Sequence, residues 1–416
     1  MAELFTVFLK IGLLSFGGPA AQIALMHRML VDEKGWLQER QFLNALNFCM
    51  LLPGPEAMQL ATYSGWRLHG IAGGIVAGLL FVLPGAAVIF ILAALYVTYG
   101  DLPLMATLFL GVKAAVLIIV LEALLRVSGR ALKHKAHWII AALAFIGIFF
   151  LALPYPLIVL AAALYGALFA NDQNKPETAP IVATSLKRTC TTVAIGLAIW
   201  VLPILALNIA TGGAILGTLG VFFSKLAVVT FGGAYAVLAY MAQVVVTDFN
   251  WLTPAEMMDG LGLAETTPGP LILVTQFVGF IAAFREGSYG LAILGGLVTL
   301  WATFIPCFLW IFTGAPYIEW MSAQPRLSGA LQAITAAVVG VILNLSIWFG
   351  LHVLFTQVSH NTLGPLTVWT PDLSSLDWRA LVLAILSTVL LLRARLGIAQ
   401  VLAISAAAAW ALSLAF

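Results

Sequence analysis

The sequence has few charged residues. Of its 416 residues, only 9% are Asp, Glu, Lys or Arg, whereas a soluble domain carries about 25%. Hydrophobic residues make up 62%, and the formal net charge of +2 leaves no large basic surface for nucleic acid. These scarcities exclude a soluble protein and a nucleic-acid-binding one. They indicate a protein that crosses a membrane several times.

Cysteines are also few, and the signatures of common catalytic sites are missing. Cys49, Cys190 and Cys307 lie in apolar segments without a CxxC pair, so we predict that they are packing residues. The six histidines have no metal-ligand spacing, and no P-loop, GxSxG or HExxH motif occurs. We therefore expect no cofactor, no metal site and no standard ATPase or hydrolase site. The N-terminus lacks the features of a cleaved signal peptide, so the first hydrophobic segment is expected to remain as a transmembrane element.

Hydrophobic runs dominate the chain and predict an all-α polytopic membrane protein. The runs 42–66 and 255–284 are interrupted by Pro53 and Pro268. About 13 runs are candidates for crossing a hydrocarbon core of ~30 Å. They lie near 3–30, 42–66, 71–98, 104–127, 137–153, 154–170, 189–209, 214–246, 255–284, 290–312, 329–355, 379–393 and 397–415.

An internal repeat organises these runs. Leu52-Pro53-Gly54-Pro55 returns as Thr267-Pro268-Gly269-Pro270 at a spacing of 268 − 53 = 215, which also carries Lys10 onto Lys225. Further on, the spacing becomes 306 − 84 = 222 and matches Pro84 to Pro306. An ordered series of matches over two halves indicates a duplication. The predicted domains are an N-terminal repeat, a linker with a connecting transmembrane helix, and a C-terminal repeat, at 1–170, 171–213 and 214–416.

The distribution of Lys and Arg in short loops predicts the orientation. With the N-terminus in the cytoplasm and every run crossing, most loop Lys and Arg residues lie inside and few outside, as the positive-inside rule requires. The extra segment 189–209 then makes the second half begin outside. The two halves are thus predicted to form an inverted-topology repeat, and interruptions at matching places are typical of the broken helices of transporters.

Two lysines stand in apolar surroundings. Lys10 lies among Phe8, Leu9 and Ile11, and Lys225 occupies the matching position of the second half. Placing a lysine at mid-membrane costs about 2.5–3.5 kcal/mol on insertion scales. Snorkelling to the interface explains one such lysine. A matched pair, each six residues before a Phe-Gly-Gly motif, favours attraction of an anion.

The breaks themselves are glycine and proline motifs. Gly17-Gly18 and Gly232-Gly233 permit unwinding, and Pro53-Gly54-Pro55 and Pro268-Gly269-Pro270 cannot continue as regular helix. Each break exposes backbone N–H groups at the start of the next half-helix, where the helix dipole favours an anion. A kink for packing is the alternative at any single break. Four breaks in two symmetric pairs predict an anion site near the middle of the bilayer.

Polar side chains near the breaks extend the predicted site. For Glu56 and Glu265, proton coupling and a structural ion pair or cap are both left open. Gln59 and Gln276 either donate hydrogen bonds to substrate oxygens or join helices. Lys113 and Glu122, on another run, are predicted to form an intrahelical polar stripe. The predicted substrate-binding set is Lys10, Gly17, Gly18, Pro53, Gly54, Pro55, Glu56, Gln59, Lys225, Gly232, Gly233, Glu265, Pro268, Gly269, Pro270 and Gln276.

These motifs in combination resemble the two-domain type of the chromate ion transporter (CHR) family over nearly the whole chain. The likeness rests on Phe16-Gly17-Gly18-Pro19, on Leu52-Pro53-Gly54-Pro55-Glu56 with Gln59-Leu60, and on the segments 265–270 and 276–280. The resemblance implies two fused homologous halves and an inner-membrane carrier that expels chromate, giving chromate resistance. One departure is Ala234, which stands where the first half has Pro19 and predicts a softer second break.

The residues by themselves leave several alternatives open. Chromate and sulfate share charge and shape, so the sequence does not rank them, and another oxyanion remains an alternative substrate. A channel and an intramembrane enzyme that uses Glu56 or Glu265 are further alternatives. The expected partners are membrane lipid, protons as the coupling ion, and further copies of the chain in a homo-oligomer. The sequence does not decide the driving force, or whether the PGP segments cross the membrane or re-enter it.

Overall fold

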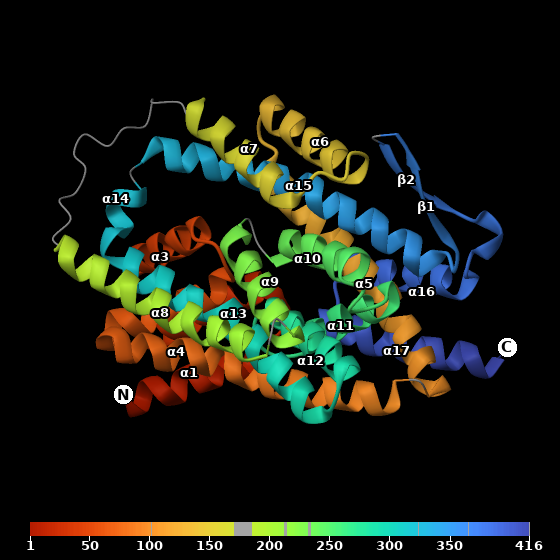
Figure 1. The fold of residues 1–416 in the computed structure, drawn as a ribbon, viewed down its shortest axis with the longest axis horizontal. Coiled ribbons are helices and arrows are strands. Elements are labelled where there is room, and N and C mark those ends of the chain that lie inside the picture. The colour runs from red at the N-terminus through yellow and green to blue at the C-terminus, as the bar shows by residue number, and fades with distance from the viewer. Residues whose placement is uncertain are drawn as a thin grey trace. The chain divides into compact units, whose positions relative to one another are not determined.

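The computed structural model describes residues 1–100, 102–169, 185–211, 214–231, 234–322, 324–364 and 366–415, and within them it is almost entirely helical (Figure 1). Two compact units are present. Unit 1 comprises Met1–Ala93, Ala170–Ala234 and Thr267–Ser328, and unit 2 comprises Ala94–Phe169, Tyr235–Thr266 and Gly329–Phe416. Each unit therefore draws on both halves of the sequence. The division into two repeats and a linker remains a prediction.

Unit 1 is organised around α13, which packs against α8, α9 and α12. A helix that is apolar over its whole length suits this central place, since it buries side chains in several directions. The elements of unit 1 are α1 (Ala2–Leu14), α2 (Gly18–His27), η1 (Arg28–Glu33), α3 (Glu39–Leu51), most of α4 (Glu56–Tyr99), α8 (Leu186–Ala210), α9 (Ile215–Val229), η4 (Leu271–Leu273), α12 (Val274–Glu286), α13 (Tyr289–Gly314), η5 (Ala315–Tyr317) and α14 (Ile318–Ser322).

Unit 2 is organised around α5, which packs against α11, α16 and α17. Its elements are α5 (Pro103–Ala131), α6 (Lys135–Phe149), α7 (Tyr155–Leu168), α10 (Ala234–Gln243), η3 (Val244–Asp248), α11 (Pro254–Thr266), most of α15 (Pro325–Leu354), β1 (Val358–Leu363), β2 (Leu366–Pro371), η6 (Leu373–Ser375), α16 (Trp378–Thr388), η7 (Val389–Arg393) and α17 (Ile398–Ala415).

Several helices have the length and composition of membrane spans. Among the described residues, five are long and apolar enough, namely α4, α5, α8, α13 with its η5 extension, and α15. Shorter apolar helices include α6, α7, α9 and α17. The chain is thus a multi-pass membrane protein. The number of about 13 crossings remains a prediction.

Both proline-interrupted runs are broken where the sequence predicts. The first run divides into α3, which ends at Leu51, and α4, which begins at Glu56. The second divides into α11, which ends at Thr266, and α12, which begins at Val274 after the short η4 turn. The predicted connecting segment 189–209 lies within α8.

A further break, which the sequence analysis did not place, lies inside α4. His69 and Gly70 leave helical geometry, with φ of −139° and 62°. The chain reverses there. Gly65 and Gly73 lie so close together that a side chain added at Gly65 would collide with the carbonyl of Gly73. The helices before and after Gly70 therefore form a close hairpin.

The segment 356–378, between the predicted crossing runs 329–355 and 379–393, contains a small antiparallel hairpin. Strand β1 pairs with β2 from Val358 opposite Pro371 to Leu363 opposite Leu366. Val368, Thr367 and Thr370 on β2 are β-branched and favour extended backbone. This hairpin, which turns at Gly364 with φ of 64°, is a local exception to the helical fold of the described residues.

Candidate functional site

The Phe-Gly-Gly break of the first half follows α1 directly. Helix α1 ends at Leu14, and Ser15 caps it in a non-helical conformation. Gly17 then has φ of 87°, so the chain turns before α2 begins at Gly18 with Pro19 in its first turn. Proline suits this position because its missing N–H would have no intrahelical partner. Gly232 and Gly233, the matching pair of the second half, lie outside the described residues.

The two PGP motifs form sharp turns at their central glycines. Gly54 has φ of 116° and Gly269 has φ of 93°, values that residues with a Cβ rarely adopt. The flanking prolines Pro55 and Pro270 end the turns and lead into the next helices. Gly54, Pro55 and the whole 268–270 motif are buried, whereas Pro53 is half-buried.

Crossed backbone hydrogen bonds join the breaks of the two halves. The Gly54 N–H donates to the carbonyl oxygen of Thr230 at 2.8 Å, and the Gly269 N–H donates to that of Ser15 at 2.9 Å. Donors and acceptors are equivalent in the repeat, since 269 − 54 = 215 and 230 − 15 = 215. Each PGP turn therefore contacts the helix end that precedes the Phe-Gly-Gly motif of the other half, within unit 1.

These crossed bonds satisfy groups that a helix cannot satisfy by itself. Ser15 and Thr230 follow the last residues of α1 and α9, and the carbonyls at a helix C-terminus lack intrahelical donors. The N–H groups of Gly54 and Gly269, which the sequence analysis included in the anion site, are therefore engaged in holding the breaks together. The first turns of α2 and α4 offer N–H groups that lack intrahelical acceptors, whereas the Val274 N–H at the start of α12 already donates within the η4 turn.

Three buried glutamines surround the breaks in unit 1. Gln22 donates from Nε2 to the carbonyl of Gly269 at 2.6 Å, and Gln59 donates to that of Pro53 at 2.7 Å. Gln276 donates to the carbonyl of Ala86 at 2.8 Å. The Oε1 atom of each glutamine is buried without a hydrogen-bond partner among the described residues. Such acceptors favour a donor, for example a water molecule, at the breaks.

Gln22 was missed by the sequence analysis. It lies three residues after Pro19, in the apolar part of α2 that precedes His27, and is 1% exposed. A buried glutamine just after a helix break is a signal that could have identified it. Its partner in the repeat is Val237, so the repeat comparison gave no second instance to draw attention to it.

The two lysines lie on the outer sides of their helices. Lys10 on α1 and Lys225 on α9 both lie at the protein surface. Neither ammonium group has a partner in the described part of the chain. They occupy equivalent positions, 225 − 10 = 215. The protein thus leaves both charges uncovered, one turn or more before the crossed bonds at Ser15 and Thr230.

The two predicted carboxylates have different surroundings. Glu56 is half-buried at the first position of α4, where the helix dipole favours a negative charge. Glu265 is 5% exposed on α11 in unit 2 and accepts a hydrogen bond from the Tyr235 hydroxyl at 2.8 Å. Glu56 therefore belongs with the breaks of unit 1, and Glu265 forms a separate polar contact inside unit 2.

The predicted polar stripe on α5 is only partly intrahelical. Glu122 pairs with Arg126, one turn further along the same helix. Lys113 instead pairs with Asp259 of α11, with Nζ 3.3 Å from Oδ1. The stripe prediction is therefore wrong for Lys113, because sequence spacing alone does not reveal a partner on another helix.

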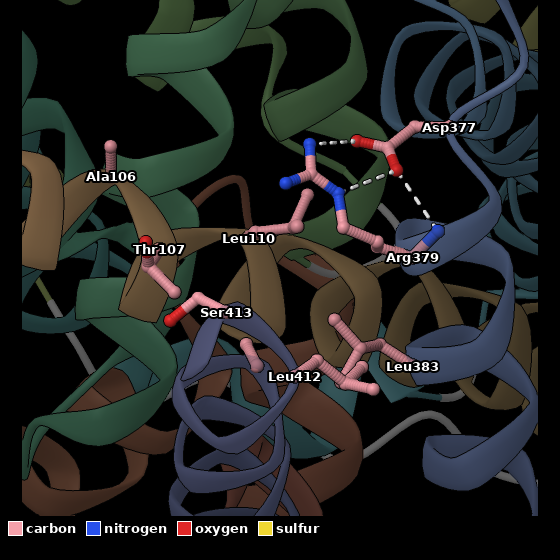
Figure 2. A pocket seen from close by; sticks show the side chains of 9 residues that line it. Ala106, Thr107, Leu110, Asp377, Arg379, Leu383, Leu412 and Ser413 are labelled. Atoms are coloured by element: carbon pink, nitrogen blue, oxygen red, sulfur yellow. Dashed lines mark hydrogen bonds and ion pairs between the residues drawn. The ribbon is translucent and has the colours of Figure 1, made fainter. Parts of the chain in front are cut away.

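A pocket in unit 2 does not involve the predicted site residues. Figure 2 shows Thr107 and Leu110 of α5, Ser413 of α17, and the pair Asp377 and Arg379 at the start of α16. Arg379 Nε lies 3.3 Å from Asp377 Oδ1, so the aspartate offsets its charge. In the described ranges, no group of three or more His, Cys, Asp and Glu side chains could hold a metal ion.

Comparison with known proteins identifies relatives that match most of this chain and shorter relatives that match less than half of it. A sequence family described as "Chromate transporter" matches residues 2–167 and 217–411. A chromate transport protein of Pseudomonas aeruginosa is 33% identical over 82% of this chain and 79% of its own length. One of Cupriavidus metallidurans is 29% identical over 82% of this chain and 80% of its own length.

A shorter relative spans about half of this chain. The uncharacterized transporter YwrA of Bacillus subtilis is 29% identical over 170 residues, which are 40% of this chain and 94% of that protein. No solved structure matches the chain.

Proposed function

Because this chain belongs to the chromate transporter family, and is therefore a transporter and not an enzyme, we propose that it exports chromate across the inner membrane as a secondary transporter. Such export would give chromate resistance. The observation that carries the proposal is the crossed pair of hydrogen bonds from Gly54 to Thr230 and from Gly269 to Ser15. It supports a centre in which broken helices of both halves meet.

The halves 1–170 and 214–416, joined by 171–213, are proposed to be an inverted repeat. Reciprocal contacts of equivalent residues are what a two-fold relation produces. The inverted direction of that axis rests on the loop charges and on the extra helix α8. A half-length relative supports the view that one half is a structural unit.

The anion site is proposed to use the helix starts at the breaks. A dianion that leaves water needs several donors at once. First-turn N–H groups of α2 and α4 can supply them without adding buried charge. Lys10 and Lys225 would attract the anion from outside the break region, because both ammonium groups are uncovered. Gln59 and Gln276, held by backbone carbonyls, would orient the neighbouring turns.

Sulfate is the second candidate substrate. Sulfate and chromate are both tetrahedral dianions, so backbone donors and lysines bind either by the same contacts. Full-length relatives named as chromate transport proteins favour chromate.

Transport into inside-out vesicles tests the proposal. We expect vesicles with the parent protein to accumulate labelled chromate, and unlabelled sulfate to reduce that uptake only if both anions share the site. Lys10→Gln and Lys225→Gln should each lower uptake at equal protein levels. Lys34→Gln is a matched control, because Lys34 pairs with Glu3 at 2.8 Å in an exposed loop and should leave uptake unchanged.

Two results would contradict the proposal. Vesicles that accumulate sulfate but no chromate would make sulfate the substrate. Parent-like uptake by both lysine variants would show that these lysines are structural.

A further inference from the structure

Asp259 is a carboxylate buried inside unit 2. It lies on α11 between Met258 and Gly260, in a stretch where residues 257–262 are all buried, and it is 5% exposed. Burying an ionised carboxylate is costly unless it is paired and hydrogen-bonded. Ionisable side chains inside membrane proteins commonly mark ion or proton pathways.

Two other elements supply the partners of Asp259. Lys113 of α5 places Nζ 3.3 Å from Oδ1, and the Tyr96 hydroxyl donates to Oδ2 at 2.9 Å. The Lys113 side chain is 18% exposed and that of Asp259 is 7% exposed. The pair therefore connects two helices, and its lysine end reaches the surface of the protein.

The surroundings of Asp259 contain few other ionisable groups. Glu256 lies one turn earlier on the same helix and adds negative charge. Tyr96 packs edge-on against Phe109 of α5, with ring centroids 5.4 Å apart. Helix α17 also packs against α11 and has no ionisable side chain. Within the described part of unit 2, Lys113 is thus the cation that faces this carboxylate.

The two oxygens of Asp259 differ in their bonding. Oδ2 accepts the Tyr96 hydroxyl, whereas Oδ1 accepts no hydrogen bond among the described residues although the Lys113 ammonium lies beside it. By contrast, Glu122 and Arg126 pair within one helix, so their bond does not depend on the position of another element. The Lys113–Asp259 pair depends on the contact between α5 and α11.

We propose that Asp259 is a proton-binding site that couples proton movement to oxyanion transport, an inference that rests on the proposed transport function. Binding forms one O–H bond at Oδ1 with a proton from water, and release breaks it. In the ionised state Asp259 attracts Lys113 across the α5–α11 contact. In the protonated state this attraction is lost while Tyr96 still donates to Oδ2. Proton occupancy thus changes the interaction between two helices, which is what coupling to a conformational equilibrium requires.

Proteoliposomes with a trapped pH-sensitive dye test this site. The full-length protein is assayed for exchange of labelled chromate at equal pH on both sides, and for proton movement during net chromate flux. The buffer is alkaline enough to keep chromate a dianion. The variants are Asp259→Asn and the double variant Asp259→Asn with Lys113→Met. The double variant leaves no unpaired buried charge, so it can be assayed even if the single variant does not fold. Glu286→Gln, at the exposed end of α12, is the matched control.

We expect the double variant to keep chromate exchange and to lose the proton movement that accompanies net flux, while Glu286→Gln retains both. A double variant that moves protons as the parent does would overturn the proton site, and so would a parent that carries net chromate flux without moving protons. A parent that exchanges no chromate would instead overturn the proposed function. The three failures are therefore distinguishable.

Discussion

Gly54 is subject to two constraints that mutation can separate. Its φ of 116° is strained for any residue with a Cβ, at a cost of roughly 1–3 kcal/mol. An added Cβ would also lie 2.8 Å from Cys307 Sγ. Gly269 has the backbone constraint with φ of 93°, but the nearest atom to its added Cβ is Leu273 Cδ1 at 3.2 Å.

We predict that Gly54→Ala lowers thermal stability in detergent and chromate exchange more than Gly269→Ala does. Adding Cys307→Ala should recover part of the loss in Gly54→Ala, because it removes the clash with Cys307 Sγ. The contact of the added Cβ with Gln59 Nε2 at 2.9 Å and the backbone strain would remain. Cys307→Ala should recover nothing in Gly269→Ala. Gly35→Ala is the control for strain alone, since Gly35 has φ of 61° and open space around its Cβ position. Equal rescue of both variants would contradict this assignment.

At the level of elements, equivalent helices of the repeat contact each other reciprocally. A side chain added at Gly74 of α4 would lie 2.6 Å from the ring of Phe312 on α13, and one added at Gly296 of α13 would lie 2.7 Å from the ring of Phe90 on α4. Both pairs follow the second repeat spacing, since 296 − 74 = 222 and 312 − 90 = 222. Each helix therefore packs a phenylalanine ring against a glycine of the other helix.

Overpacking at each of these glycines should be relieved only when the facing phenylalanine is replaced by a smaller side chain. We predict that Gly74→Ala and Gly296→Ala each destabilise the protein by about 1–3 kcal/mol. Phe312→Leu should rescue Gly74→Ala, and Phe90→Leu should rescue Gly296→Ala, as measured by thermal unfolding in detergent. The exchanged combinations are the controls and should show no rescue. Rescue by either phenylalanine variant alike would mean that these contacts are not specific.

The sequence predicts the breaks better than it predicts what they contact. Proline and glycine restrict the backbone locally, so the interruptions at Pro53 and Pro268 follow from the residues themselves. The bond from Gly269 to Ser15 joins positions far apart in the chain, and nothing local indicates it. Asp259 escaped notice for the same reason, because its partner Lys113 lies on another helix. The hairpin at 358–371 was missed because a short polar segment resembles a loop.

At the level of the whole molecule, each half of the sequence needs the other to complete unit 1. The end of α1 receives a backbone donor from Gly269, and the end of α9 receives one from Gly54. A half expressed by itself would leave its helix end and its PGP glycine without these partners. Unpaired backbone groups are costly where no water can replace the lost hydrogen bond.

We predict that a chain cut between Lys175 and Pro176 retains transport when both pieces are made together. Either piece made alone should accumulate poorly and transport no chromate. The measurements are the amount of each piece in the membrane and chromate uptake into vesicles, with the uncut chain as the control. Full uptake by one piece alone would show that the crossed bonds are not required.

The crossed bonds can form only some time after synthesis of the first half, when the second partner of each bond has been made. Thr230 is made 230 − 54 = 176 residues after Gly54, and Gly269 is made 269 − 15 = 254 residues after Ser15. At about 5–20 residues per second, these intervals are on the order of 10 to 50 s. During that time the Ser15 carbonyl at the end of α1 lacks its backbone donor from Gly269 and has only Gln22 Nε2 of its own half, at 3.3 Å. Unit 1 can therefore close only late in translation, after the second PGP turn has left the ribosome.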